Sequence, residues 1–450
     1  MSIPIFEVQI DKNANLVIPL QQQDIVNALT APGNTFTDVV VMSHGWNNDM
    51  DEARTLYRNF FGSLEQVSPA AAGKTLAVGI LWPSKKFVEA DLIPGGAASA
   101  DNDPVADGVL LQRLEDMKQV FDDPQADEKL EQMKALVAGL SKDANQQNQF
   151  VSLMGAILDQ HTDPTQRSED EGKATISGCA QNNGGAKVLK SFGLSITQKV
   201  TPGGGGAASV GGLAGNPALH PGGAGAAAGL GDFFSGIKAG ALRLLNFATY
   251  NVMKDRAGKI GRDAVNPLLQ GIQKGVPETL KFHLVGHSFG GRLVTATVDG
   301  PNALRVQTLL LLQAAYSHNG LAKSFDSNQL NKSGFFHAVF DNHKVTGPIL
   351  ITHSKHDSAV GLAYPLASRL NGDNAAGIGD ANDLFGGMGA NGAQHVDKVD
   401  TPLLAIDGGN YDFTTSGKLV FNLNGDAIIQ SHGDVARPET AAVLAAAMKL

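Results

Sequence analysis

The segment LVGHSFGGRLV (residues 284–294) places a serine between two glycines, where an apolar run gives way to a helix-compatible sequence. Residues 286–290 match the G-x-S-x-G pattern of a nucleophile elbow, in which a strand turns sharply into a helix and presents Ser288 at the tip. A Cβ atom two positions on either side of this serine would clash with the neighbouring strand or helix. The pentapeptide alone is common in a chain with 53 glycines, so its meaning depends on partners elsewhere.

The composition favours a globular protein of one large domain or up to about three domains. Of its 450 residues, 42% are hydrophobic and 18% are charged. A net charge of −9 without any Lys/Arg-rich block argues against a nucleic-acid partner. The single Cys179 excludes an intrachain disulfide and a thiolate metal cluster. We expect a cytoplasmic protein, because no Sec-type signal or apolar stretch of about 18 residues is visible; export by a signal-less route stays open.

Short apolar runs predict a parallel sheet. Residues 39–42 and 75–84 read as strands buried on both faces, and the helix-compatible residues 50–64 lie between them. A strand, a helix and a strand in this order form a crossover unit with parallel strands. After the elbow, residues 306–315 and 348–352 predict two further buried strands.

The ends of the chain predict edge strands and a closing helix. Residues 3–20 alternate loosely and favour two antiparallel edge strands. Residues 419–423 and 427–430 are the last strand candidates. Pro438 then opens a predicted C-terminal helix.

Residues 85–235 interrupt the strand pattern. Apolar residues recur at helical spacing in residues 125–140 and again after residue 150, which predicts amphipathic helices. A solvated helical bundle is the default interpretation, and a lid over an apolar site is the alternative. Residues 201–231 form a Gly/Ala-rich linker. We therefore divide the chain into a first part of the core (1–84), a helical insertion (85–235) and a second part of the core (236–450).

A serine hydroxyl needs a histidine to take its proton and a carboxylate to orient that histidine. In folds with a nucleophile elbow, these follow in the order serine, acid, histidine, on loops after the strands. Asp357 follows a predicted strand and His432 precedes the terminal helix. We therefore predict Ser288, Asp357 and His432 as catalytic residues.

Other residues compete for these roles. His395, at the end of the long Gly/Ala/Asn-rich segment 371–394, is the rival base. Asp326 and Asp341 are the rival acids, since they follow the predicted strand before the one that leads to Asp357. Asp434 is better explained as a helix cap before Pro438.

Acyl transfer also needs hydrogen-bond donors for a developing oxyanion. The backbone N–H of Phe289, the residue after the nucleophile, is the first candidate. The second is expected in the loop after the strand that precedes the first helix, where Trp46 follows His44 and Gly45. We assign Phe289 and Trp46 to the oxyanion hole. His44, Gly45 and His287 are assigned to the substrate-binding surroundings, with His287 expected to pack behind the serine.

Taken together, these blocks resemble α/β-hydrolase-fold serine hydrolases. The similar blocks are VVVMSHGWNND, ILWPS, LVGHSFGGRLV and the loops of Asp357 and His432. The combination of HGWN, WPS and a G-H-S-x-G elbow is similar to a group of uncharacterised bacterial members. The resemblance covers residues 36–83 and 236–450. It implies a mostly parallel central sheet flanked by helices. It does not cover residues 85–231, so we expect residues 85–235 to be a helical, Gly-rich insertion in this fold, as a cap or lid.

The resemblance implies a Ser-Asp-His hydrolase that uses neither a metal nor an organic cofactor. We expect a carboxylic ester hydrolase that forms an acyl-enzyme at Ser288 on a small-molecule or lipid-like ester. The amphipathic insertion favours a lipase-like substrate. A peptidase or amidase, a thioesterase, and a catalytically silent binding protein of the same fold are the alternatives. The oligomeric state stays open.

Overall fold

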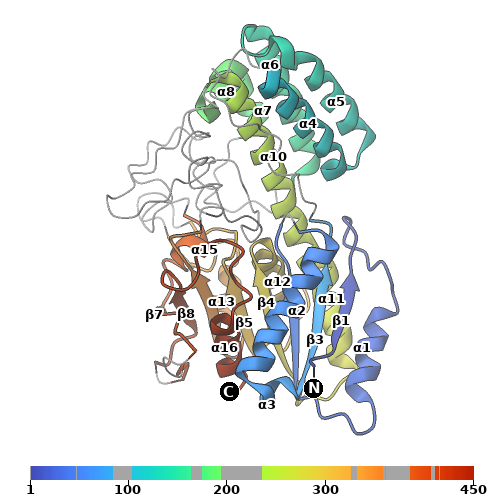
Figure 1. The fold of residues 1–450 in the computed structure, drawn as a ribbon, viewed down its shortest axis with the longest axis vertical. Helices are drawn as coiled ribbons and strands as arrows, with labels where there is room; N and C mark the ends of the chain where they lie inside the picture. Colours follow the sequence, from blue (N-terminus) through green and yellow to red (C-terminus); the bar gives the residue numbers. More distant parts are fainter. Residues whose placement is uncertain are drawn as a thin grey trace.

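The computed structural model describes most of the chain as a sheet with flanking helices and a bundle of helices above it (Figure 1). The described residues are 2–46, 48–84, 104–163, 175–193, 236–325, 332–357, 360, 386–406, 411–414 and 416–450.

Eight strands form one sheet in which every neighbouring pair is parallel. The strands are β1 (Ile5–Gln9), β2 (Asp38–Ser43), β3 (Thr75–Leu81), β4 (Lys281–His287), β5 (Thr308–Leu312), β6 (Ile349–His353), β7 (Lys398–Pro402) and β8 (Val420–Asn424). Their order across the sheet is β1-β3-β2-β4-β5-β6-β8-β7. Strands β2 to β5 are apolar runs because helices cover both faces of the sheet.

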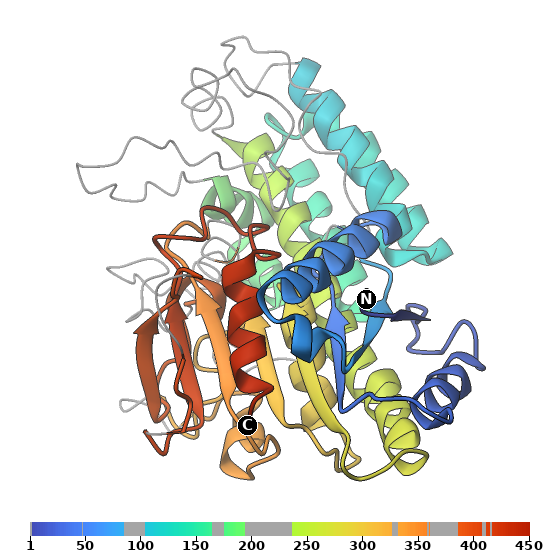
Figure 2. The ribbon, with the colours of Figure 1, turned by 60° about the horizontal axis from the view of Figure 1, so that its bottom comes forward.

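Side chains of β2 alternate between two hydrophobic cores. Val40 and Met42 face the core under α2 (Met50–Val67) and α16 (Pro438–Ala447), which lie side by side across one face of the sheet (Figure 2). Val39 and Val41 face the other core. That face is covered by α1 (Gln21–Thr30), α11 (Asn266–Lys274) and α12 (Phe289–Asp299). The short helices of this part are α3 (Pro69–Ala72), α13 (His337–Asp341) and α15 (Met388–Asn391).

The described residues of the insertion form helices joined by short connections. Its helices are α4 (Pro104–Phe121), α5 (Pro124–Leu136), η1 (Val137–Gly139), α6 (Ala144–His161), α7 (Ile176–Asn183) and α8 (Gly185–Gly193). Lys118 and Lys134 each pair with both Glu115 and Glu131, which ties α4 to α5. The long helix α10 (Ile237–Ile260) packs on α8 at one end and on α12 at the other, and the π-helical turn η4 (Gly261–Val265) leads it into α11. The helix α10 therefore connects the bundle to the sheet (Figure 1).

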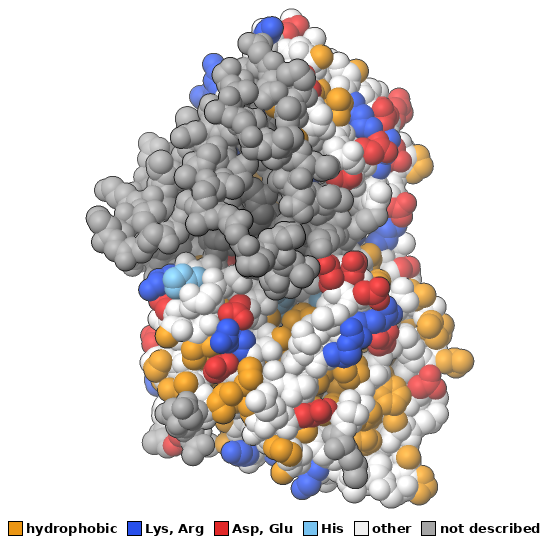
Figure 3. Space-filling view, viewed as in Figure 1, with side chains coloured by type: hydrophobic (Ala, Val, Ile, Leu, Met, Phe, Trp, Pro, Cys, Tyr) orange, Lys and Arg blue, Asp and Glu red, His pale blue; other side chains and the backbone are white. Residues whose placement is uncertain are grey.

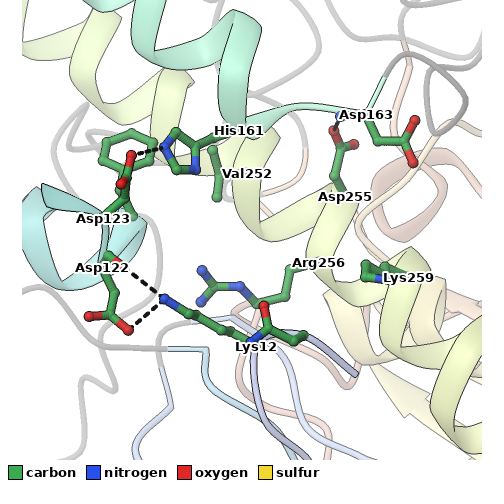
Figure 4. Close-up of a pocket in the computed structure, with 11 residues that line it drawn as sticks. Lys12, Asp122, Asp123, His161, Asp163, Val252, Asp255, Arg256 and Lys259 are labelled. Atoms are coloured by element: carbon green, nitrogen blue, oxygen red, sulfur yellow. Dashed lines mark hydrogen bonds and ion pairs between the residues drawn. The ribbon is translucent and has the colours of Figure 1, made fainter. Parts of the chain in front are cut away.

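A polar pocket lies where the bundle meets the sheet (Figure 4). Lys12, from the loop after β1, pairs with Asp122 at the end of α4 at 2.6 Å. Arg256 of α10 donates to the carbonyl oxygens of Pro83 at 2.9 Å and of Val120 at 2.7 Å. Arg256 thus bonds both to the chain that follows β3 and to the last turn of α4. On the face shown in Figure 3, positive and negative side chains are interspersed over the described surface.

The predicted α/β class, the parallel sheet and the helical insertion are confirmed. The expectation for residues 3–20 is wrong: β1 is a single strand parallel to β3, and only an Ile10–Leu16 bridge is antiparallel. The helix α1 follows β1, so the chain crosses over before it re-enters the sheet.

Residues 427–430 are also not a strand. They form a turn in which the N–H groups of Ile428 and Ile429 both donate to the carbonyl of Gly425. The last strands are β8 and β7, and the segment of β7 was not predicted. The strand order also differs from the usual order of the α/β-hydrolase fold. The Gly/Ala-rich residues 201–231 and residues 371–385 lie outside the described part of the chain.

Candidate functional site

Ser288 stands at a strained turn between β4 and α12. Its φ of 57° and ψ of −125° place a non-glycine residue in a sparsely populated region of backbone space. Hydrogen bonds hold this conformation: the Ser288 N–H donates to the Leu312 carbonyl at 3.0 Å. The Ser288 carbonyl accepts from the N–H groups of Gly291 at 2.9 Å and Ala315 at 3.0 Å. The end of β5 therefore stabilises the turn of β4.

Close packing of the backbone explains why the positions two residues before and after Ser288 are glycines. A Cβ atom on Gly286 would lie 2.3 Å from the carbonyl oxygen of Gly290. A Cβ atom on Gly290 would lie 2.2 Å from the carbonyl oxygen of Ser43, at the end of β2. Both distances are shorter than a carbon–oxygen contact allows, so only glycine lets the strand, the helix and β2 approach this closely.

Asp357 and His432 form a buried hydrogen-bonded pair. His432 Nδ1 lies 2.9 Å from Asp357 Oδ2, and the carboxylate side chain is fully buried. The other carboxylate oxygen accepts from the Val360 N–H at 3.1 Å. Because the carboxylate accepts the proton on Nδ1, the lone pair of the imidazole lies on Nε2, as a general base requires.

The elbow is bonded directly to the loop that carries His432. The His287 Nε2 donates to the His432 carbonyl oxygen at 2.9 Å, and the two rings lie 4.9 Å apart. Burial, followed by the proximity of His432, lowers the pKa of His287 to about 3. A neutral His287 therefore anchors the backbone of His432 to the residue that precedes Ser288.

The loop after β2 lies against Ser288. A Cβ atom on Gly45 would be 2.4 Å from Ser288 Cβ and 3.0 Å from Ser288 Oγ. The Trp46 ring packs on Phe289 at 6.0 Å, and both residues are buried. His44 is also fully buried. The fold thus brings Gly45, Trp46 and Phe289 to the serine. His44 was predicted to contact substrate, but both of its ring nitrogens contact protein atoms.

Two residues of this region were not predicted from the sequence. Gln313, just after β5, donates from Nε2 to Asp357 Oδ2 at 3.3 Å, while its Oε1 accepts from Thr352 at 2.9 Å. Its backbone has a positive φ of 46°. Its position directly after the five apolar residues of β5 is the one sequence feature that marks it, and this feature does not indicate its partner. Tyr250 of α10 packs on Phe289 at 4.9 Å.

The rival residues have other partners. His395 Nδ1 lies 2.7 Å from the side-chain oxygen of Asn319. This partner is an amide and not the carboxylate that orients a catalytic histidine. Asp341 pairs with His337, and Asp326 lies outside the described residues. The expectation that Asp434 caps the last helix is wrong. It pairs with Arg437, which is itself the N-cap residue.

Comparisons with protein-family models, with curated proteins and with solved structures find no match. Within the described ranges, no group of three or more His, Cys, Asp or Glu residues is arranged to hold a metal ion. No helix in the described part of the chain is long and apolar enough to cross a membrane.

Proposed function

We propose that this chain is a serine hydrolase that cleaves carboxylic esters through an acyl-enzyme at Ser288. The observation that carries the proposal is the buried Asp357–His432 pair, bonded through the His432 carbonyl to the residue before a strained serine. A structural role alone does not require a positive φ at Ser288 or an imidazole oriented by a buried carboxylate.

In the proposed reaction, His432 Nε2 takes the proton of Ser288 Oγ as this oxygen attacks the ester carbonyl carbon. The carbonyl oxygen becomes an oxyanion, which accepts hydrogen bonds from the N–H groups of Phe289 and Trp46. The intermediate collapses, and His432 returns the proton to the leaving alcohol. Water then attacks the acyl-enzyme by the same steps and releases the acid.

The sheet supports this assignment, and we propose that the fold is a variant of the α/β-hydrolase fold. The serine follows β4 in the middle of the sheet, the acid follows β6, and the histidine follows β8. This is the chain order serine, acid, histidine of that fold. The parallel β1 and the additional edge strand β7 are departures from it.

The aromatic residues beside the serine favour an apolar acyl group. Tyr250, Phe289 and Trp46 pack on one another at ring distances of 4.9–6.4 Å. Tyr250 belongs to α10, the helix that connects the insertion to the core. The helix that supports the insertion therefore also contributes an aromatic ring to the surroundings of the serine.

Hydrolysis of p-nitrophenyl esters from acetate to palmitate, with the matching p-nitroanilides, tests the proposal. We expect the wild type to release p-nitrophenol, with faster turnover of longer acyl chains and little release of p-nitroaniline. Ser288→Ala should abolish turnover, whereas Ser191→Ala, which removes a hydroxyl bonded to the Val188 carbonyl within the insertion, should not. Preference for the anilides would instead indicate an amidase. A folded wild type that is inactive on every substrate would contradict the proposal.

A further inference from the structure

The carbonyl oxygen of Gly45 receives hydrogen bonds from three side chains. His44 Nδ1 and Ser84 Oγ each lie 2.9 Å from it, and Asn48 Nδ2 lies 3.3 Å away. Ser84 comes from the chain after β3, and it also lies 3.1 Å from the Asn48 carbonyl oxygen. Two lone pairs are available on a carbonyl oxygen. Three donors therefore exceed what is needed to satisfy one buried acceptor.

His44 is held as a donor to this carbonyl. The Trp82 N–H donates to His44 Nε2 at 3.2 Å, so the ring proton lies on Nδ1 and points to Gly45. The Trp82 ring stacks on the imidazole at 5.4 Å with 15° between the planes. Burial lowers the pKa of His44 to about 4, which keeps this tautomer neutral around pH 7.

The three donors determine the orientation of the peptide unit between Gly45 and Trp46. In a trans peptide the carbonyl oxygen and the following N–H point in opposite directions within one plane. Fixing the Gly45 carbonyl on the side of His44, Ser84 and Asn48 thus fixes the direction of the Trp46 N–H. Hydrogen bonds to the carbonyl also polarise the amide and strengthen its N–H as a donor.

This peptide unit lies beside the serine. The close approach of Gly45 to Ser288 Cβ and Oγ means that small rotations of the unit move the Trp46 N–H relative to the reacting oxygen. A hydrogen-bond donor in an oxyanion hole must be held in place before the reaction, since reorienting it during the reaction would raise the barrier.

We propose that His44, Ser84 and Asn48 are positioning residues that hold the Trp46 amide ready for the oxyanion. The inference rests on the proposed function. It assigns a role to the serine of the WPS segment and moves His44 from substrate contact to support of the oxyanion loop.

The test uses Ser84→Ala, Asn48→Ala and the double variant in the full-length protein. Removing a whole oxyanion-hole donor costs about 10²–10³-fold in kcat, so loss of one of three supports should lower kcat about 10-fold. The double variant should lose about 100-fold, with KM for p-nitrophenyl esters within about 2-fold of the wild type. Asn48 is only half-buried, so Asn48→Ala remains informative if Ser84→Ala fails to fold.

A trifluoromethyl ketone supplies a readout that a structural role would not move. The Ser288 Oγ adds to the ketone carbon, His432 accepts the proton, and the former carbonyl oxygen becomes the oxyanion. Its inhibition constant should therefore rise in step with the loss of kcat/KM. Thr75→Val is the matched control, because it removes a buried hydroxyl bonded to the Ala71 carbonyl at the other end of β3. It should leave both quantities unchanged.

The outcomes separate this inference from the proposed function. If the wild type neither hydrolyses esters nor binds the ketone, the proposed function fails. If the wild type is active, but the folded double variant keeps its kcat and its inhibition constant within about 2-fold, only the positioning role is refuted.

Discussion

Replacing Gly45 by alanine tests the geometry around Ser288 with a single methyl group. Its Cβ would lie 2.4 Å from Ser288 Cβ, whereas carbon atoms in contact are about 3.5–4.0 Å apart. The loop and the serine must therefore separate by about 1 Å or more. Gly45 does not have a positive φ, so the new contact is the reason for the effect rather than backbone strain.

A misplacement of about 1 Å in an active site can reduce the rate about 10²-fold, which corresponds to about 2.7 kcal/mol of activation free energy. Overpacking destabilises a folded core by about 1–3 kcal/mol, less than the roughly 5–15 kcal/mol that stabilises a typical domain. We therefore expect Gly45→Ala to fold but to react with a fluorophosphonate about 100-fold more slowly than the wild type.

The control is Gly62→Ala, on the exposed side of α2, where a new Cβ would have no atom within 4 Å. This variant should react at the wild-type rate and gain about 0.5–1 kcal/mol of stability, because alanine is the better helix former. A folded Gly45→Ala variant that reacts as fast as the wild type would show that Gly45 does not lie against a reacting serine.

Three further changes have calculable effects. Asp357→Asn should lower kcat for ester hydrolysis roughly 10⁴-fold, because an amide does not stabilise the protonated histidine; a loss below 10-fold would contradict the assignment. His44 has a pKa of about 4 when folded and about 6.5 when unfolded, so the unfolded chain takes up the proton first as the pH falls. The free energy of unfolding should therefore fall between pH 6.5 and pH 4, with His44 contributing roughly 2 kcal/mol at pH 5. Because the lowered pKa of His287 adds a loss of the same sign, chemical denaturation at pH 7 and pH 5 should compare the wild type with a His44→Phe variant, in which the fall is smaller. Arg256→Ala should lower the free energy of unfolding by about 2–3 kcal/mol, because the carbonyls of Pro83 and Val120 lose their charged donor. Hydrogen exchange of the amides in α4 should become faster, and unchanged exchange would show that Arg256 does not hold α4 in place.

The local features of the site could be predicted from the sequence. The turn at Ser288 depends on glycines two residues away, and the buried strands depend on continuous apolar runs, so both signals are local. The pairing of Asp357 with His432 was predictable because the order of the loops along the chain constrains which residues meet at one edge of a parallel sheet.

Contacts between distant segments were not predictable. Ser84 meets the Gly45 carbonyl across 39 residues of sequence, and Gln313 meets Asp357 across 44, without a local pattern that connects them. Periodicity gives no information about which loops approach each other, since approach depends on strand register and on packing across the whole sheet.

The edges of the sheet were the least predictable part. The sequence KVDTP of β7 carries two charges and a proline, which suits an edge strand that has one neighbour, but gives a weak strand signal. Residues 427–430 show the opposite error, because their apolar run gives a strand signal although they form a turn. Ile429 is fully buried in this turn.

Identifying the residue that a fluorophosphonate modifies tests directly whether Ser288 is the nucleophile. After reaction of the full-length protein and proteolysis, mass spectrometry should find one phosphonylated peptide, with the adduct on Ser288. The adduct should be absent from Ser288→Ala and should form orders of magnitude more slowly in a His432→Ala variant, because the serine then lacks its base. A folded wild type without an adduct, or a Ser288→Ala variant that is modified as fast as the wild type, would show that Ser288 is not an activated nucleophile.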